Sequence, residues 1–154
     1  RLVHGQGQLW IKALGVNTVI VADDEAAADP MAQTLMKTVI PNNIAMRFFT
    51  IQKVIDIIHK AAPAQTIFLI VKNPANALRL VKGGVPITEL NVGNIHNADG
   101  KEKVTRSIFV GPEDKAAIIE MADKYGVTFN TKTTPSGADG TVEVDLVAFC
   151  KQSA

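Results

Sequence analysis

The sequence is poor in cysteine, aromatic residues and net charge, and it contains no long hydrophobic run. Cys150 is the single cysteine among 154 residues, which excludes a disulfide within this chain and favours a reducing compartment. The longest apolar runs, such as Ile67–Val71, are far too short to cross a bilayer. Sixteen basic and 15 acidic residues leave a formal net charge of +1, without the excess of lysine and arginine that nucleic-acid-binding proteins carry. We therefore expect a cytoplasmic protein with no nucleic-acid partner.

The residues that are present describe an ordinary globular chain. Hydrophobic residues make up 47% of the sequence and charged residues 20%, which is typical of folded domains rather than of disordered segments. A chain of 154 residues can bury a hydrophobic core without disulfides or metal ions. We therefore expect one domain over residues 1–154.

Short apolar runs alternate along the chain with segments of helical periodicity. The runs typical of strands cover residues 18–22, 45–50 and 66–71, and weaker ones cover 90–92, 107–110, 127–129 and 142–146. The helical segments cover residues 9–14, 30–39, 54–61, 77–81 and 112–125. Two polar stretches, 94–103 and 131–141, are expected to form surface loops.

This alternation predicts an α/β fold with a single open, mostly parallel, twisted sheet and helices on both faces. The continuous apolar character of residues 19–22 and 67–71 agrees with this fold, because parallel strands are buried on both faces. In such folds ligands bind at the carboxyl ends of the strands, where loops lead into helix N-termini. A functional site is therefore expected in the loops after these strand ends and in the segment before the first helix.

The most informative segment is the first one, Arg1-Leu2-Val3-His4-Gly5-Gln6-Gly7, which leads directly into a helical pattern. Unpaired amides at a helix N-terminus bind anions, and glycines let a ligand approach the backbone. A neutral histidine is nucleophilic near pH 7, since its ordinary pKa is about 6.5. Arg1 can hold phosphoryl oxygens. His4, Arg1 and the amides of Gly5, Gln6 and Gly7 thus form a candidate phosphoryl-accepting site, with an ordinary surface histidine as the alternative.

Polar residues that follow the predicted strands are further candidates. Asp23 follows the first strand, Lys72 the third, and Asn94 comes shortly after a weaker one, so each can line a cleft at the strand ends. Asp23 is interpreted equally well as a helix cap, and Lys72 as part of a turn into the next helix. His59 and His96 are expected to be surface histidines, and no two histidines have metal-ligand spacing on a helix. We therefore expect no metal site.

Several segments resemble one known family. Residues 1–6 resemble the active-site loop of the IIB component of the bacterial phosphoenolpyruvate-dependent sugar phosphotransferase system, in its mannose/fructose/sorbose family. Residues 21–29 (VADDEAAAD), 72–74 (KNP), 80–87 (LVKGGVPI) and 91–94 (NVGN) are similar to further blocks of that family, in the same order. The fold that this resemblance implies is an open parallel α/β sheet, in agreement with the hydrophobic pattern.

The resemblance implies a chemical role for the opening segment. It makes His4 the residue that is phosphorylated and Arg1 its phosphate-binding partner. In this family the IIB histidine takes a phosphoryl group from a phosphohistidine of the IIA component and passes it to the hexose or amino sugar held by the membrane components IIC and IID. The resemblance therefore implies a sugar phosphotransferase that works through a phosphohistidine without a cofactor, in the cytoplasm and at the periphery of the membrane permease.

Two differences from the family pattern concern the same segment. The family has a strand and an acidic residue before the arginine, whereas this sequence begins at Arg1. We therefore expect that the N-terminal strand of the domain is missing from the sequence. Gly7 stands where a larger residue is more usual, which costs the start of the helix about 1 kcal/mol.

Alternatives to this interpretation stay open. The main alternative function is a non-catalytic regulatory or sugar-phosphate-binding α/β domain, and a flavodoxin-like cofactor protein is less well supported because no flavin loop is found. Residues 47–50 and 91–96 look closer to the N-acetylgalactosamine or galactosamine branch of the family than to the mannose branch. Neither the sugar nor the presence of a homodimer follows from the sequence.

Overall fold

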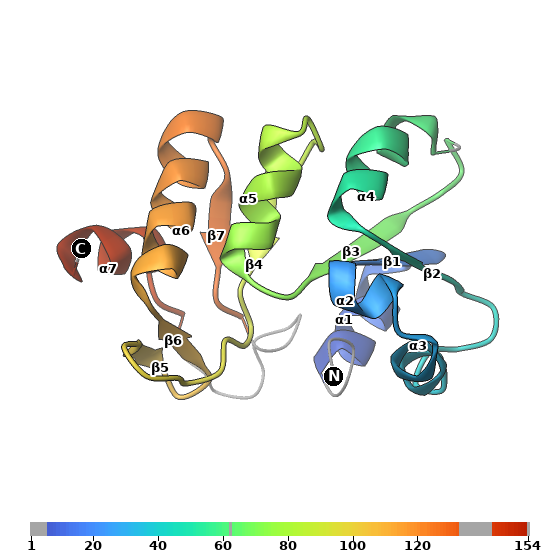
Figure 1. Cartoon of the computed structure of the whole chain (residues 1–154), viewed down its shortest axis with the longest axis horizontal. Coiled ribbons are helices and arrows are strands. Elements are labelled where there is room, and N and C mark those ends of the chain that lie inside the picture. The colour runs from blue at the N-terminus through green and yellow to red at the C-terminus, as the bar shows by residue number, and fades with distance from the viewer. Residues whose placement is uncertain (1–5, 62, 133–142, 154) are drawn as a thin grey trace. The chain divides into compact units, whose positions relative to one another are not determined.

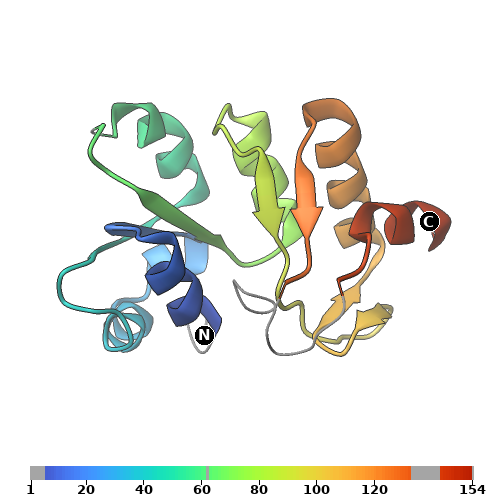
Figure 2. The same cartoon turned by 180° about the vertical axis from the view of Figure 1, so that it is seen from behind.

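The computed structural model describes residues 6–61, 63–132 and 143–153, and the chain divides into two compact units. We call Arg1–Lys72 with Lys82–Val85 the N-terminal unit, and Asn73–Val81 with Pro86–Ala154 the C-terminal unit. Each unit contains its own helices and strands (Figures 1 and 2) and its own cluster of buried hydrophobic residues.

The N-terminal unit is built on three parallel strands. Its elements are α1 (Gln6–Leu14), β1 (Thr18–Ala22), α2 (Asp24–Ala27), α3 (Pro30–Lys37), β2 (Ala45–Phe49), α4 (Ile51–Ile57), the 3-10 helix η1 (Ile58–Lys60) and β3 (Ile67–Val71). The strand order is β2-β1-β3, with Ile20 of β1 opposite Arg47 of β2 and Leu69 of β3. All five residues of β1 are buried, as expected for a central strand that is covered on both faces.

The two faces of this sheet are covered by different helices. Val19 and Val21 belong to a buried cluster with Ile11 of α1 and Met36 of α3, and the side chains of Phe68 and Ile70 pack against it. Figures 1 and 2 show α1 on one face of the sheet and α4 on the other. Since successive side chains of a strand point to opposite faces, the apolar run of β1 supplies both layers.

Helix α1 and strand β1 run in opposite directions (Figure 2). A three-residue connection joins them, and Gly15 within it has a φ of 63°, in the left-handed region that glycine adopts without a steric penalty. Because of this turn, the first residues of α1 lie at the end of the sheet where the parallel strands have their carboxyl ends.

The C-terminal unit contains two short sheets and three helices among its described residues. Its elements are α5 (Pro74–Lys82), β4 (Glu89–Asn91), β5 (Glu102–Thr105), β6 (Ile108–Val110), α6 (Pro112–Tyr125), β7 (Thr128–Asn130) and α7 (Leu146–Ser153). Strands β4 and β7 pair in parallel, and β5 and β6 pair in antiparallel fashion. Its core includes Ile108, Val110, Ile118, Leu146 and Cys150.

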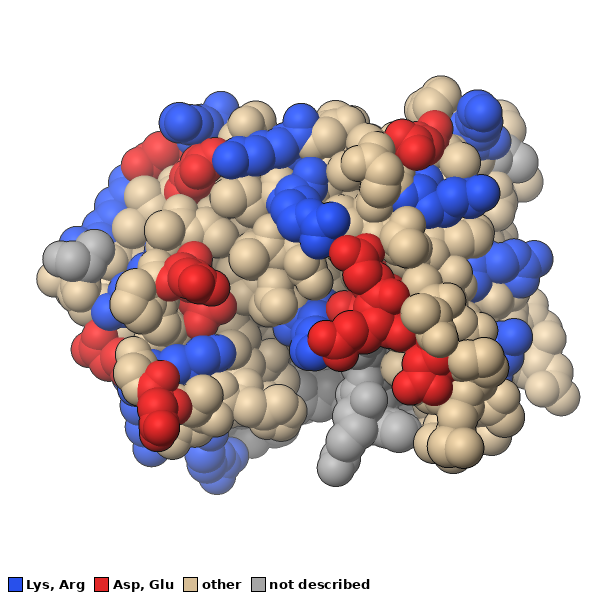
Figure 3. All heavy atoms as spheres, in the orientation of Figure 1, with Lys and Arg blue, Asp and Glu red and all other residues tan. Residues whose placement is uncertain are grey.

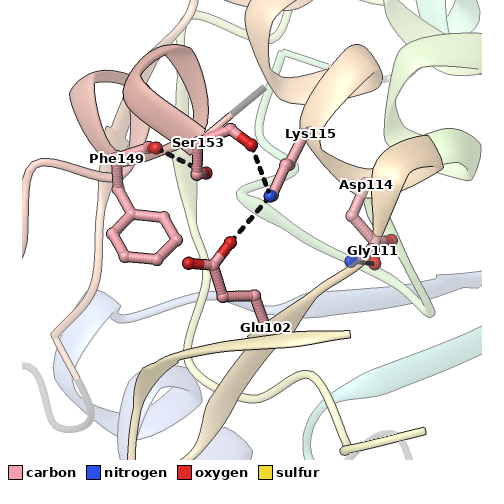
Figure 4. A network of polar contacts seen from close by, with 6 residues as sticks. All are labelled: Glu102, Gly111, Asp114, Lys115, Phe149 and Ser153. Atoms are coloured by element: carbon pink, nitrogen blue, oxygen red, sulfur yellow. Dashed lines mark hydrogen bonds and ion pairs between the residues drawn. The ribbon is translucent and has the colours of Figure 1, made fainter. Parts of the chain in front are cut away.

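Polar contacts fix the start of α6 and connect it to α7 and β5 (Figure 4). Asp114 is in the first turn and accepts a hydrogen bond from the Gly111 amide at 2.9 Å, an arrangement that satisfies a free N–H at the helix start. The Lys115 ammonium donates to Glu102 at 2.9 Å and to the Ser153 carbonyl at 3.1 Å. One helix therefore holds both a strand of the hairpin and the last helix.

The structure confirms the α/β class and the mostly parallel pairing, and it places the three strong strands as expected. The described strands pair in three separate sheets rather than one. The physical reason is that β2 and β3 occupy both edges of β1, and none of the described strands extends the sheet beyond either of them.

Three local expectations were wrong. Residues 143–145 are irregular and Leu146 begins a helix, because Asp145 accepts a hydrogen bond from the Ala148 amide and caps α7. Glu102 and Lys103 form a strand rather than a loop, since the β5–β6 ladder uses backbone groups and leaves their side chains exposed. Thr131, expected on the surface, is only 1% exposed and its hydroxyl accepts a hydrogen bond from the Val144 amide.

Candidate functional site

The start of α1 is the described part of the opening segment. The helix begins at Gln6, with Gly7 in its first turn, and this turn carries no acidic side chain. The first amides of a helix have no partner inside the helix and carry a partial positive charge, which favours a bound anion. His4, Arg1 and Gly5 lie outside the described residues, so their role stays a prediction.

Asp23 acts as a helix cap in the structure. It directly follows β1, its side chain is buried at 5% exposure, and one carboxylate oxygen accepts a hydrogen bond from the Ala26 amide at 3.0 Å. The carboxylate therefore satisfies a free donor at the start of α2. Of the two roles that the sequence allowed for Asp23, the structure supports the capping one.

Lys72 lies at the carboxyl end of β3 and contacts a residue of α2. Its ammonium is 3.4 Å from the Glu25 carboxylate, and the two side chains are 50% and 83% exposed. The sequence predicted a cleft position for Lys72 but did not identify Glu25 as its partner. The signal was the acidic run of residues 23–25, which follows the neighbouring strand in the sheet.

Two further contacts hold the loops at this edge of the sheet. The Asp24 side chain accepts a hydrogen bond from the Ile51 amide at 2.9 Å and thus connects α2 to the start of α4. The Thr50 hydroxyl accepts one from the Lys53 amide and caps α4. The segments that follow β1 and β2 are therefore held by the side chains of Asp24 and Thr50. Acidic side chains gather over α2 (Figure 3).

The C-terminal unit has polar groups at the ends of its parallel strands. The Asn91 side-chain amide donates to the Asn130 side chain at 2.6 Å and to the Lys132 carbonyl at 2.8 Å. Asn94 follows in an exposed position of the loop after β4. The sequence singled out residues 91–94, but it missed Asn130, because the partner strand carries no sequence signal of its own for this pairing.

The remaining titratable candidates are not gathered into a site. His59 on η1 and His96 in the loop after β4 are both exposed, as predicted. Among the described residues, no group of histidine, cysteine and acidic side chains could hold a metal ion. Burial raises the pKa of the Cys150 thiol from 9.0 to about 11, so this thiol stays protonated at neutral pH. No described helix is long and apolar enough to span a membrane.

Comparison with known proteins decides the family. The family model of the sorbose-subfamily IIB component of the phosphotransferase system (PTS) matches residues 1–153. This chain belongs to that family. Its IIB fold is matched by the crystal structure of a PTS-dependent N-acetylgalactosamine IIB component from Streptococcus pyogenes, with a TM-score of 0.93 and 58% identity over 97% of this chain and 91% of that chain.

Two curated relatives come from Escherichia coli (strain K12). The N-acetylgalactosamine-specific phosphotransferase enzyme IIB component 2 is 50% identical over 79% of this chain and 78% of the relative. Component 1 is 43% identical over 74% of this chain and 73% of the relative. These relatives agree with the resemblance to the amino-sugar branch that the sequence indicated.

Membership of the IIB family defines the general activity of the chain. It is a phosphotransferase subunit of a sugar-uptake system, which receives a phosphoryl group and passes it on to the sugar, together with other components of the phosphotransferase system. The alternative of a non-catalytic binding domain is not favoured. Helix α1 begins at the end of the sheet where β1–β3 have their carboxyl ends. Anion binding is expected at this end of the described structure.

Proposed function

We propose that this chain is the IIB component of an amino-sugar phosphotransferase system of the N-acetylgalactosamine type. In this proposal residues 1–154 act as one IIB domain that receives its phosphoryl group from a phosphohistidine of a IIA component. His4 accepts the group and donates it to the sugar carried by the IIC and IID components. The observation that carries the proposal is the segment Arg1-Leu2-Val3-His4-Gly5-Gln6 at the start of a helix, inside a family match over residues 1–153.

The first transfer exchanges one nitrogen–phosphorus bond for another. The unprotonated ring nitrogen of His4 attacks the phosphorus, and the bond to the donor histidine breaks with its electron pair returning to the donor ring. If the donor ring is protonated on its other nitrogen, it leaves as a neutral imidazole, and phospho-His4 carries the corresponding proton. Arg1 and the amides of Gly5, Gln6 and Gly7 hold the phosphoryl oxygens during this step.

The second transfer needs only an acceptor oxygen. A sugar hydroxyl attacks the phosphorus of phospho-His4, the nitrogen–phosphorus bond breaks, and the proton of the hydroxyl is released. Positioning and charge stabilisation are sufficient for such a step, so we propose no cofactor besides the phosphohistidine itself. The protein would act in the cytoplasm, against the membrane components. Asp23, Lys72 and Asn94 stay candidates for lining the cleft, with the Asp23 carboxylate already engaged as a cap.

The test is a phosphorylation assay with His4→Ala beside the wild-type protein. The full-length protein is incubated with phosphoenolpyruvate, the general phosphotransferase proteins and a IIA component, and mass spectrometry detects an acid-labile phosphoryl group. We expect one group on the wild type and none on His4→Ala, because the variant lacks the accepting nitrogen.

Two control variants separate His4 from the other histidines. His59→Ala and His96→Ala change exposed histidines and should leave the labelling intact. Equal labelling of the wild type and His4→Ala would move the site to one of these two residues. A folded wild-type protein that takes up no phosphoryl group would contradict the proposed function as a whole.

A further inference from the structure

Helix α3 has an exposed face without charged side chains. Met31 and Leu35 lie one helical turn apart, and they are 75% and 59% exposed. Thr34 and Thr38 are exposed at the same helical spacing. Their hydroxyl groups donate to the carbonyls of Pro30 and Leu35 at 3.0 and 2.6 Å, so both hydroxyl hydrogens are already used. We call Met31, Thr34, Leu35 and Thr38 the α3 patch. Large exposed apolar side chains grouped on one face are typical of an interaction surface.

Other residues of the helix hold α3 in place. Met36 is 5% exposed and belongs to the buried cluster of the N-terminal unit. The side-chain amide of Gln33 donates to the Ala26 carbonyl of α2 at 2.9 Å. The side chains of Met31 and Leu35 are therefore not needed for the position of α3 and can contact a partner.

The α3 patch has an acidic border at the N-terminal end of the helix. Residues 23–36 contain four acidic residues and no basic one, and among them Glu25 and Asp29 are exposed. Lys72 pairs with Glu25, and Lys37 lies in the last turn of α3, at the opposite end. Figure 3 shows acidic side chains over α2, with uncharged surface beside them at the position of α3. A complementary partner surface is therefore apolar and carries lysine or arginine next to its apolar part.

The size of the patch favours a short-lived contact over a stable dimer. Helix α3 has eight residues and is about 12 Å long. One face of such a helix offers far less than the roughly 800 Å² that each partner buries in a stable interface, whereas transient complexes bury less. A subunit that receives a group from one protein and passes it to another has to bind and leave repeatedly, which agrees with a small surface.

The charge of the border distinguishes the partners that such a subunit can meet at a membrane. Cytoplasmic loops of membrane proteins carry an excess of lysine and arginine, and these would attract Glu25 and Asp29. Anionic lipid headgroups would repel the same carboxylates. The α3 patch therefore fits the cytoplasmic face of a membrane protein better than the lipid around it.

We propose that the α3 patch docks the protein on a basic cytoplasmic surface of the membrane components that pass the phosphoryl group to the sugar. This inference rests on the proposed function. Met31 and Leu35 pack against apolar side chains of that surface, and Glu25 and Asp29 attract its lysine and arginine residues, which speeds the encounter.

The test measures two transfers separately with the full-length protein. In the first, a phosphorylated IIA component labels the protein in solution. In the second, the phosphorylated protein phosphorylates N-acetylgalactosamine in inverted membrane vesicles that contain IIC and IID. The double variant Met31→Ser/Leu35→Ser should raise the half-saturating protein concentration of the second transfer about 10- to 100-fold, as the loss of two apolar anchors does at other interfaces. The first transfer should keep the wild-type rate.

Charge variants test the acidic border. Asp29 caps α3 through the Ala32 amide, and Asp29→Asn removes the charge but keeps the cap, because asparagine caps helices as well as aspartate does. Combined with Glu25→Gln, it should weaken binding to the vesicles at low salt and make this binding less dependent on salt than in the wild type. Tyr125→Ser removes an exposed apolar side chain of the C-terminal unit. As the matched control, it should leave both transfers unchanged.

The remaining outcomes separate other occupants from failure of the proposed function. Thermal unfolding should show all variants folded, since the changed side chains are exposed. A second transfer at the wild-type level in the double variant would overturn the inference, and so would a loss confined to the first transfer, which would assign the patch to the IIA component. Equal binding of the wild type to vesicles with and without IIC and IID, or a wild-type dimer that only the double variant dissociates, would also overturn it. A wild type that takes up no phosphoryl group would overturn the proposed function instead.

Discussion

Two aspartates that cap neighbouring helices of the N-terminal unit differ in their surroundings. Asp23 is buried and accepts a hydrogen bond from the Ala26 amide at 3.0 Å, whereas Asp29 is exposed and accepts one from the Ala32 amide at 3.1 Å. The hydrogen bond has almost the same length in both cases. The difference in burial therefore decides which of the two caps matters more for stability.

Replacing Asp23 should destabilise the protein more than replacing Asp29. We expect Asp23→Ala to lower the free energy of unfolding by about 1–2 kcal/mol, because a buried amide loses its acceptor. Asp29→Ala should cost about 0.5–1 kcal/mol, since water can replace the lost acceptor. Urea unfolding of the two variants measures the difference, and an equal loss in both would show that burial plays no part.

The buried thiol of Cys150 makes stability depend on pH above neutrality. Its pKa rises from 9.0 to about 11, mainly through burial; the Lys115 ammonium lowers the pKa, and the Asp114 and Glu102 carboxylates raise it by smaller amounts. Above pH 9 the unfolded chain releases the thiol proton while the folded chain still retains it, so the thiol lowers the free energy of unfolding as the pH rises towards 11. The full effect is about 2–3 kcal/mol, at 1.36 kcal/mol for each pKa unit.

Comparing the wild type with Cys150→Ala isolates this effect from the other groups that titrate at high pH. The variant is expected to be less stable at pH 8, because a buried side chain is shortened. The stability difference between the two proteins should then shrink as the pH rises from 9 to 11. Urea unfolding at a series of pH values measures this difference, and a constant difference would refute the assigned pKa.

At the scale of elements, α6 shows how a helix end is determined by the sequence. The pattern predicted this helix over residues 112–125, and the structure confirms both ends. Pro112 is compatible with a first helical turn, and Gly126 ends the helix with a φ of 68°. Side chains other than glycine rarely adopt this backbone conformation, so the boundary was readable from two residues.

Gly126→Ala should therefore destabilise α6 although its added methyl group would meet open space. We expect a loss of about 1 kcal/mol in the free energy of unfolding, because alanine is strained at positive φ. Gly111→Ala is the matched control at the other end, where φ is −99° and the added carbon would lie at an ordinary 3.5 Å from the Lys101 side chain. Chemical denaturation of both variants should show the smaller loss in Gly111→Ala.

At the scale of the whole molecule, the sequence predicted the elements better than their pairing. Strands β1 and β3 were predictable because a short, continuous apolar run rich in β-branched residues is typical of a strand in a parallel sheet. The structure confirms full burial for β1 alone, whereas β3 is only half-buried because it is the last of the three strands and has no described neighbour on its outer side. The partner of each strand was not predictable, since hydrogen bonds between backbones do not require particular side-chain types. Residues 142–146 were predicted as a strand for a related reason, whereas Leu146 begins α7: this helix depends on Asp145 as a cap and on burial of Leu146 and Cys150 along one face.

The candidate site shows the same division between chemistry and geometry. The residue types in the opening segment, together with the family resemblance, were enough to predict phosphoryl transfer, and the family match confirms that activity. The sequence left two roles open for Asp23, and it did not predict the partner of Lys72, because a strand-end residue can face a ligand, cap a helix or pair with a neighbour. The contact between Lys72 and Glu25 joins residues that are 47 positions apart, which only the folded chain brings together.

The route of the chain between the two units has a consequence for biosynthesis. The polypeptide leaves the N-terminal unit after Lys72 and returns to it for Lys82–Val85. This returning stretch contributes the buried Val85, and Gly83 lies so close to Ile55 that an added Cβ would be 2.5 Å from its side chain. A nascent chain that has emerged only as far as Lys72 therefore lacks the buried Val85 and the packing of Gly83 against Ile55. Residues 1–85 must therefore all have left the ribosome before the N-terminal unit can complete its fold.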